Sequence, residues 1–138
     1  MMPDTAADLP WQPLARSGRV PLLVVRHGQT AWNASGRFLG TSDIPLDETG
    51  RQQVSGLGKA LSGIPLSAAH SSPLSRASQT AAAILEGRSL ALQLDPRLAE
   101  LDQGDLEGAR FSEVLGEHAA FFASWQKDPA SCRVPGGE

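Results

Sequence analysis

The chain has 138 residues, of which 41% are hydrophobic and 20% are charged, and its formal net charge is -3. These values are typical of one globular domain with its own core, and the absence of a basic run argues against a nucleic-acid-binding protein. No apolar stretch approaches the ~20 residues that cross a bilayer, and the single cysteine, Cys132, excludes an internal disulfide and fits a reducing compartment. We therefore expect a cytoplasmic protein with neither a membrane nor a nucleic acid as its partner.

The chain begins with a segment that carries three prolines and has no hydrophobic period. Residues 1–19 also contain acidic side chains and lack the apolar stretch of a secretory signal. We expect these residues to form a loosely ordered arm, and residues 20–138 to form one domain. The apolar run at 21–26 is short, rich in Val and Leu, and does not alternate, which predicts a fully buried first strand.

A polar segment with several glycines and prolines follows that strand, from Gly28 to Leu46. Its length predicts a functional loop, because long irregular connections are uncommon in compact domains unless they carry function. Asp47 is the expected N-cap of a helix whose apolar stripe includes Val54 and Leu61.

The rest of the chain alternates short apolar segments with helical patterns. In chain order we expect a strand at 66–70, a helix at 73–86, a strand at 90–94, an acidic loop at 97–108 and a helix at 112–126. Strands that alternate with helices predict an α/β fold, with a mainly parallel sheet and helices on both of its faces.

Basic and acidic side chains follow the ends of the predicted strands. Arg26 ends the first strand and His27 follows it, and Arg76 lies in the first turn of the second helix, where an anion is favoured. Glu100 follows the third strand, at the same expected edge of the sheet. Arginines stabilise a transferring phosphoryl group, histidine supplies a nucleophilic nitrogen, and a carboxyl group can protonate a leaving oxygen. The pattern predicts a phosphate-handling site centred on His27.

Each of these residues also has a simpler interpretation. A histidine after a strand is more often a hydrogen-bonded structural residue, and Arg76 taken alone would more often be a solvated surface residue. Three other acids in the same loop compete with Glu100 on proximity and are by default surface residues: Asp102, Asp105 and Glu107.

Several sequence blocks, in order along the chain from about residue 21, resemble the histidine phosphatase superfamily, also called the phosphoglycerate mutase-like family. Residues 26–33 (RHGQTAWN) resemble its RHG signature, and residues 71–81 (SSPLSRASQTA) resemble its second block. The remaining similar blocks are 36–40 (GRFLG), 43–46 (DIPL), 98–108 (LAELDQGDLEG) and 135–138 (PGGE).

The resemblance implies a role for each matching residue. His27 corresponds to the nucleophile that becomes phosphohistidine, and Glu100 to the proton donor of the leaving group. Arg26 and Arg76 correspond to the arginines of the phosphate pocket. No metal and no cofactor are implied, because arginines and backbone dipoles neutralise the phosphate. Two further positions are implied in binding phosphate or substrate: Asn33 and Gly40.

Two departures from the family pattern stand out. Leu106 occupies a position where tryptophan is usual, a change that we expect to alter packing more than chemistry. The family also has a second histidine, in a His-Gly pair on a later strand, and no such pair follows residue 28 here. We therefore expect this chain to be the N-terminal portion of a longer enzyme. By itself it would be marginally stable and prone to aggregate, because an apolar sheet edge would be exposed.

The leading functional hypothesis is hydrolysis of a small phosphate monoester through a phosphohistidine at His27. Details of the loops at 36–46 and 104–108 resemble the phosphatase branches, and the region from Trp125 to Glu138 resembles α-ribazole phosphatase-like members. A phosphoglycerate mutase-type phosphoryl transfer is the enzymatic alternative. An inactive, truncated phosphate-binding module is the alternative of a different class. The identity of the substrate and the oligomeric state stay open.

Overall fold

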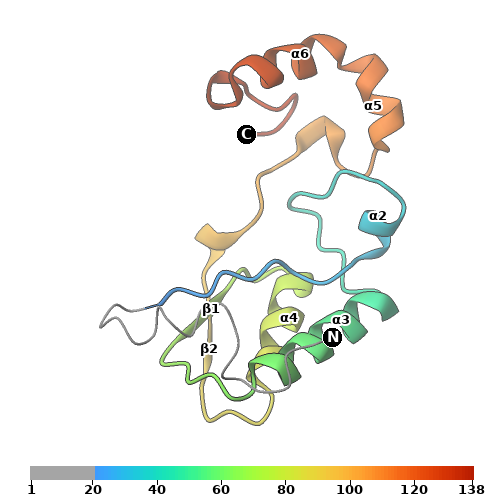
Figure 1. Ribbon diagram of the computed structural model, residues 1–138. Coiled ribbons are helices and arrows are strands. Elements are labelled where there is room, and N and C mark those ends of the chain that lie inside the picture. The colour runs from blue at the N-terminus through green and yellow to red at the C-terminus, as the bar shows by residue number, and fades with distance from the viewer. Residues whose placement is uncertain (1–20) are drawn as a thin grey trace.

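The computed structural model describes residues 21–138, so the expected arm at 1–19 lies outside the described residues. Figure 1 shows the helices and strands in chain order. Among these residues, no helix has the length and apolar character needed to cross a membrane. The elements are α2 (Ala31–Ala34), α3 (Glu48–Leu61), β1 (Ala69–Ser71), α4 (Ser75–Leu85), β2 (Leu92–Leu94), α5 (Phe111–Glu117) and α6 (Ala119–Lys127), with 3-10 turns at Pro96–Leu98, Gly104–Leu106 and Pro129–Ser131.

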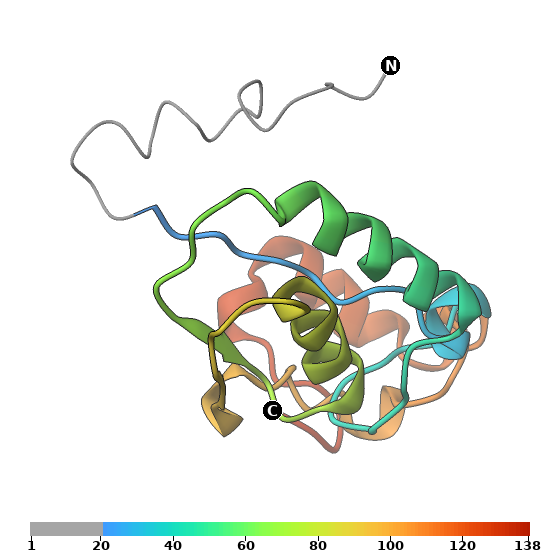
Figure 2. The same cartoon turned by 90° about the horizontal axis from the view of Figure 1, so that it is seen from below.

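A parallel two-stranded sheet confirms the expected α/β fold. Strands β1 and β2 pair with Ala69 opposite Leu92 and Ser71 opposite Leu94. Helix α4 connects the two strands, which makes β1–α4–β2 a crossover unit. This helix packs against both strands, and α3 packs against α4 on its other side (Figure 2). Both strands fall within the ranges expected around 66–70 and 90–94, although β1 extends one residue further.

The prediction of a buried first strand at 21–26 is wrong. These residues form no strand, and Leu22 and Val24 are 87% and 82% exposed. In Figure 1 this blue segment runs past β1 as an extended chain. A strand requires a neighbour that accepts its hydrogen bonds, and within the described residues the main chain of 21–27 has none. The apolar composition indicates that this segment can form a β-strand, but a strand forms only where another segment pairs with it.

The first long helix, α3, matches its prediction. Asp47 accepts a hydrogen bond from the Gly50 amide at 2.7 Å and thereby satisfies one of the unpaired donors of the first turn. Val54 and Leu61 are buried, as expected for the apolar stripe, and the helix packs against α4. The helix ends at Leu61, ahead of Pro65.

Helix α4 begins at Ser75, two residues after the predicted start at Pro73. The hydroxyl of Ser72 accepts from the Leu74 amide at 3.2 Å and so forms a local turn instead of an N-cap. At the other end, Arg88 donates to the carbonyls of Ile84 and Ile64 at 3.1 and 2.6 Å, and also to the carbonyl of Leu61. One guanidinium therefore satisfies terminal carbonyls of both α3 and α4.

The single helix expected at 112–126 is two helices, α5 and α6. The break lies at His118, whose backbone angles of φ -114° and ψ 30° leave the helical region. The glycine at 116 weakens the last turn of α5, since glycine is a poor helix former. The break directs α6 so that Phe121 and Phe122 pack on a core built from Leu106, Val114 and Val134.

Leu106, at a position where the family that the sequence resembles usually has tryptophan, is only 1% exposed. Its neighbours in the core are apolar side chains from α5 and from the segment before residue 135. Leu106 therefore lies in the apolar core, and the expectation that the substitution alters packing more than chemistry stays a prediction.

Candidate active site

His27 follows the extended segment 21–26 and is half-buried. Its Nδ1 lies 2.7 Å from the carbonyl oxygen of Gly28. A carbonyl can only accept, so Nδ1 carries the proton in this contact and Nε2 keeps its lone pair. The hydrogen bond therefore selects the tautomer in which Nε2 can act as a nucleophile.

The surroundings of His27 favour its neutral form. Burial lowers the pKa of the imidazole below its ordinary value of 6.5, and the positive charges of Arg76 and Arg26 lower it further. The hydrogen bond to Gly28 and the charge of Glu100 act in the opposite direction without reversing the shift. The structure thus brings the charges of both predicted arginines and of Glu100 to bear on this ring.

Gly28 lies where no side chain fits. A Cβ at this position would lie 2.8 Å from the carbonyl oxygen of Gly50 and 2.9 Å from a methyl group of Val54. Its amide donates to Oγ1 of Thr80 at 3.1 Å, and that hydroxyl donates to the carbonyl of Arg76 at 2.7 Å. The backbone beside His27 is therefore fixed between α3 and α4.

A shallow hollow of about 200 Å³ opens beside His27. Asn33, in the short helix α2, lines it and accepts from both the amide and the hydroxyl of Thr30 through Oδ1. These contacts occupy the side-chain oxygen of Asn33, so its Nδ2 is the donor that can bind a ligand. The residues that line the hollow are Arg26, His27, Gly28, Gln29, Asn33 and Gln53.

Arg76 is buried, with 2% of its surface exposed, and not solvated as the simpler interpretation would have it. Its Nη1 and Nη2 donate to the carbonyls of Ser42 and Gly40 at 2.8 and 2.5 Å. Burial lowers the pKa of this guanidinium, while the charges of Glu100, Asp43 and Glu107 raise it. An arginine remains charged under these conditions, so the site holds one buried cation beside His27.

Gly40, whose carbonyl accepts from Arg76, is also buried. A Cβ there would lie 2.3 Å from a carboxylate oxygen of Glu107 and 2.4 Å from the carbonyl of Leu101. The position therefore requires glycine because the chain from 101–107 passes directly against it.

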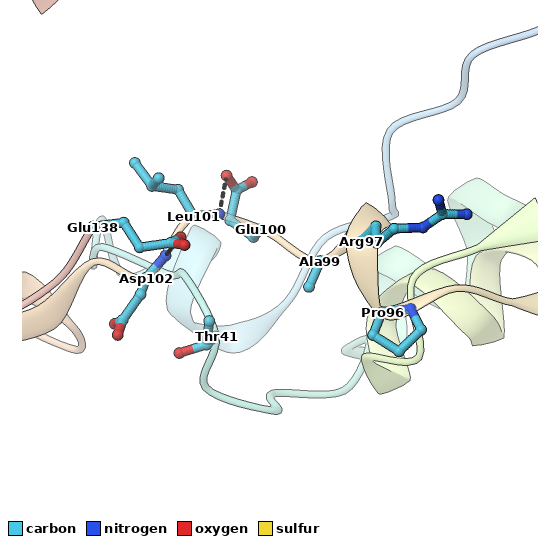
Figure 3. Close-up of a pocket in the computed structure, with 8 residues that line it drawn as sticks. All are labelled: Thr41, Pro96, Arg97, Ala99, Glu100, Leu101, Asp102 and Glu138. Atoms are coloured by element: carbon cyan, nitrogen blue, oxygen red, sulfur yellow. Dashed lines mark hydrogen bonds between the residues drawn. The ribbon is translucent and has the colours of Figure 1, made fainter. Parts of the chain in front are cut away.

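Glu100 lines a different and larger hollow of about 550 Å³. Its exposed carboxylate accepts from the amide of Leu101 at 3.0 Å (Figure 3). Figure 3 also places Asp102, Glu138 and Thr41 around this hollow. Glu100 is thus within electrostatic reach of His27, but its side chain is turned back along its own segment.

Two residues in this region have contacts that the sequence does not predict: Thr80 is not singled out there, and Glu107 is considered only as a competitor of Glu100 and by default as a surface acid. Thr80 is buried and holds Gly28, and Glu107 accepts from the amides of Thr41 and Ser42. Both belong to the family blocks, which is the signal that could have singled them out. The other two histidines lie elsewhere: His70 is exposed in β1, and His118 separates α5 from α6.

No group of three or more His, Cys, Asp or Glu side chains in the part of the chain that the structure describes is arranged to hold a metal ion. Cys132 is a free, partly buried thiol.

Comparison with known proteins gives consistent matches. Residues 22–138 match the family Histidine phosphatase superfamily (branch 1). Phosphoserine phosphatase 1 of Hydrogenobacter thermophilus is 35% identical over 119 residues, which are 86% of this chain and 56% of that protein. The protein named Probable phosphoglycerate mutase GpmB of Salmonella choleraesuis is 35% identical over 115 residues, which are 83% of this chain and 54% of that protein.

Solved structures give the same result. The α-ribazole phosphatase of Shigella flexneri superimposes with a TM-score of 0.74 at 30% identity, over 83% of this chain and 56% of that one. The chain thus spans about half the length of the relatives that it matches. With a family match across nearly all described residues, this chain belongs to the histidine phosphatase superfamily, branch 1.

Proposed function

We propose that this protein is a phosphatase that hydrolyses a small-molecule phosphate monoester through a phosphohistidine at His27. The observation that carries the proposal is the contact of Nδ1 with the Gly28 carbonyl, which leaves Nε2 unprotonated beside two guanidinium groups. The names of its relatives, which include a phosphoserine phosphatase and an α-ribazole phosphatase, support the same reaction class.

The reaction has two steps. In the first, the Nε2 lone pair attacks phosphorus, the bond from phosphorus to the ester oxygen breaks, and Glu100 gives its proton to the departing oxygen. In the second, water attacks the phosphoryl group on Nε2 and transfers a proton to the Glu100 carboxylate. The products are an alcohol and inorganic phosphate, and His27 returns to its neutral form.

Arginine charges and hydrogen-bond donors stabilise the transferring phosphoryl group in this proposal. Arg26 and Arg76 neutralise its oxygens, and Nδ2 of Asn33 donates to the phosphate or to the organic part of the substrate. Gly40 allows the loop backbone to approach the substrate. Glu100 must rotate away from the Leu101 amide to reach the leaving oxygen, and its exposure leaves it free to do so.

A mutase is the second candidate, because one relative carries the name of a phosphoglycerate mutase. A mutase returns the phosphoryl group from His27 to a second hydroxyl group before water can attack. The two activities are separated by the product: free phosphate indicates hydrolysis, and a phosphorylated isomer of the substrate indicates transfer.

A phosphate-binding module without turnover is the third candidate. It would use the guanidinium groups of Arg26 and Arg76, whose charges act on His27. Such a protein would bind phosphate at Arg26 and Arg76 and release no product.

The proposal also covers the domain organisation, the cellular location and the partner of this protein. Residues 20–138 would belong to one phosphatase domain in the cytoplasm, where the single Cys132 would stay reduced. Its partner would be a small phosphorylated substrate and not a nucleic acid.

The test is an assay with p-nitrophenyl phosphate, combined with acid-quench detection of the phosphorylated protein. We compare the wild type with His27→Ala and with His70→Ala, which removes an exposed imidazole outside the site. The proposal expects turnover and an acid-labile phosphoryl group in the wild type and His70→Ala, and neither in His27→Ala. Equal turnover in His27→Ala would exclude the phosphohistidine, and binding of phosphate without turnover would favour the third candidate.

A further inference from the structure

The carboxylate of Glu107 is directed at the backbone of the loop at 40–43. One oxygen accepts from the amide of Thr41 at 2.6 Å, and the other accepts from the amide of Ser42 at 3.2 Å. A carboxylate that accepts from successive main-chain donors fixes the orientation of those peptide groups more firmly than a neutral acceptor would.

The same loop meets Arg76 on its other side. The guanidinium donates to the carbonyl of Gly40 at 2.5 Å and to that of Ser42 at 2.8 Å. The amide of Thr41 and the carbonyl of Gly40 belong to one planar peptide group, in which N–H and C=O point in opposite directions. A single peptide group therefore bridges the negative charge of Glu107 and the positive charge of Arg76.

Hydrogen bonds on the two sides of a peptide group strengthen one another in a buried setting. The Arg76 side of the bridge is buried, whereas the contact between Glu107 and the Thr41 amide lies at the surface, so this strengthening acts mainly on the bond from Arg76 to the Gly40 carbonyl. A third contact completes the support, since Asp43 accepts from the amide and the hydroxyl of Ser75 at 2.6 and 2.8 Å. The loop thus joins the first turn of α4, which contains Arg76, to the segment that contains Glu107.

We propose that Glu107 is a positioning residue that sets the orientation of Arg76 through the peptide group between Gly40 and Thr41. The inference rests on the proposed function, in which Arg76 binds the phosphoryl group. Glu107 makes no contact with the phosphate in this proposal. It keeps the Gly40 carbonyl turned toward Arg76, and this fixed acceptor holds the guanidinium ready for an anion.

Other acids of the same segment do not take part in this bridge. Asp102 accepts from the amide of Gly104 at 2.9 Å, within its own turn. Glu100 accepts from the amide of Leu101 next to it. Of the four acids between 100 and 107, Glu107 is the one whose hydrogen bonds reach the loop at 40–43.

The test is a comparison of Glu107→Gln with Glu117→Gln in the full chain. Glutamine keeps the size of the side chain but offers one acceptor oxygen in place of two. Glu117 is exposed in α5, and its substitution removes the same charge outside the site. Inorganic phosphate is the probe, and its Kd is measured by titration calorimetry. We expect Glu107→Gln to weaken phosphate binding by about tenfold or more and Glu117→Gln to change it by less than about twofold.

Side-chain nitrogen NMR gives a readout that a loss of stability alone would not produce. The guanidinium resonances of Arg76 should shift in Glu107→Gln relative to the wild type. Those of Arg88, which lies outside the bridge, should keep their wild-type chemical shifts. If Glu107→Gln does not fold, the wild type still provides a test, because phosphate binding at Arg76 should shift the amide resonance of Thr41. Unchanged Arg76 resonances in the folded variant, or an unchanged Thr41 amide in phosphate-bound wild type, would overturn the inference.

Arg76→Met separates this inference from the proposed function. Loss of phosphate binding in Arg76→Met, with full binding in Glu107→Gln, would overturn the positioning role and leave the phosphate site intact. Equal phosphate binding by the wild type and Arg76→Met would overturn the phosphate site, and the positioning role with it.

Discussion

The hydroxyl of Thr80 connects the amide of Gly28, 52 positions earlier, to the first turn of α4. It accepts from Gly28 at 3.1 Å and donates to the carbonyl of Arg76 at 2.7 Å. Since Gly28 also supplies the carbonyl that holds the imidazole of His27, one buried side chain sets the backbone next to the candidate nucleophile.

Replacing Thr80 with valine should lower the free energy of unfolding by about 1–3 kcal/mol, because the buried Gly28 amide loses its acceptor. Valine preserves the shape of the side chain and removes only the hydroxyl. Thermal unfolding followed by circular dichroism measures the effect. The control is Thr49→Val, on the exposed surface of α3. A Thr80→Val variant as stable as the control would show that water replaces the hydroxyl.

The titration of His27 should report its surroundings. The imidazole is buried and close to two guanidinium groups, so its midpoint, followed by NMR, should lie below 6.5. Arg26→Gln removes one of the charges that lower the pKa and should move the midpoint upward. An unchanged midpoint in Arg26→Gln would mean that the Arg26 charge does not act on the ring.

The same shift makes stability depend on pH. Between the lowered pKa of the folded state and 6.5, the unfolded chain binds more protons at this residue, so the free energy of unfolding increases with pH. This contribution is complete above 6.5 and is lost as the pH falls through the folded pKa. His27→Gln should remove it. Urea unfolding at several pH values measures the slope, and an identical slope in His27→Gln would contradict the assignment.

Two glycines of α3 should respond to alanine in opposite directions. A Cβ at Gly56 meets nothing within 4 Å, so Gly56→Ala should raise the free energy of unfolding by about 0.5–1 kcal/mol. A Cβ at Gly58 would lie 2.4 Å from the carbonyl oxygen of Ala83 in α4, so Gly58→Ala should lower it by about 1–3 kcal/mol. Urea unfolding measures both. Equal effects would mean that α3 and α4 pack less closely than described.

Arg88 should stabilise the fold without affecting phosphate binding. Arg88→Met keeps much of the apolar stem but leaves terminal carbonyls of α3 and α4 without their donor, at a cost of about 1–3 kcal/mol. Lys59→Met, on the exposed side of α3, should change stability by less than about 0.5 kcal/mol. Chemical unfolding gives the stabilities, and a phosphate titration at low temperature tests that binding persists in Arg88→Met.

Local signals predicted some elements of this fold and failed for others. Helix α3 followed from the Asp47 cap and an apolar stripe, because both signals lie within the helix itself. The expected strand at 21–26 failed because a strand depends on a partner elsewhere in the chain. The break at His118 also escaped prediction, since the apolar spacing of 112–126 continues across it, and the core around Leu106 determines the direction of α6.

In the candidate site, too, the sequence predicted the types of the residues but not the contacts between them. The sequence blocks predicted which residues carry charge or nucleophilic nitrogen, and the charges of Arg26, Arg76 and Glu100 do act on His27. Spacing could not predict that the Arg76 guanidinium binds the carbonyls of Gly40 and Ser42, because this contact joins segments more than 30 residues apart.

The loop at 40–43 is held mainly through its main chain, and this leaves one of its side chains available for a reporter group. Thr41 is exposed; its amide donates to Glu107 at 2.6 Å, and its hydroxyl makes only a long contact of 3.5 Å with the same carboxylate. The chain has only one other thiol to remove, Cys132. A fluorophore attached at Thr41→Cys in a Cys132→Ser background would lie one peptide group away from the Arg76 contact, so its emission would follow the arrival and departure of phosphate in real time.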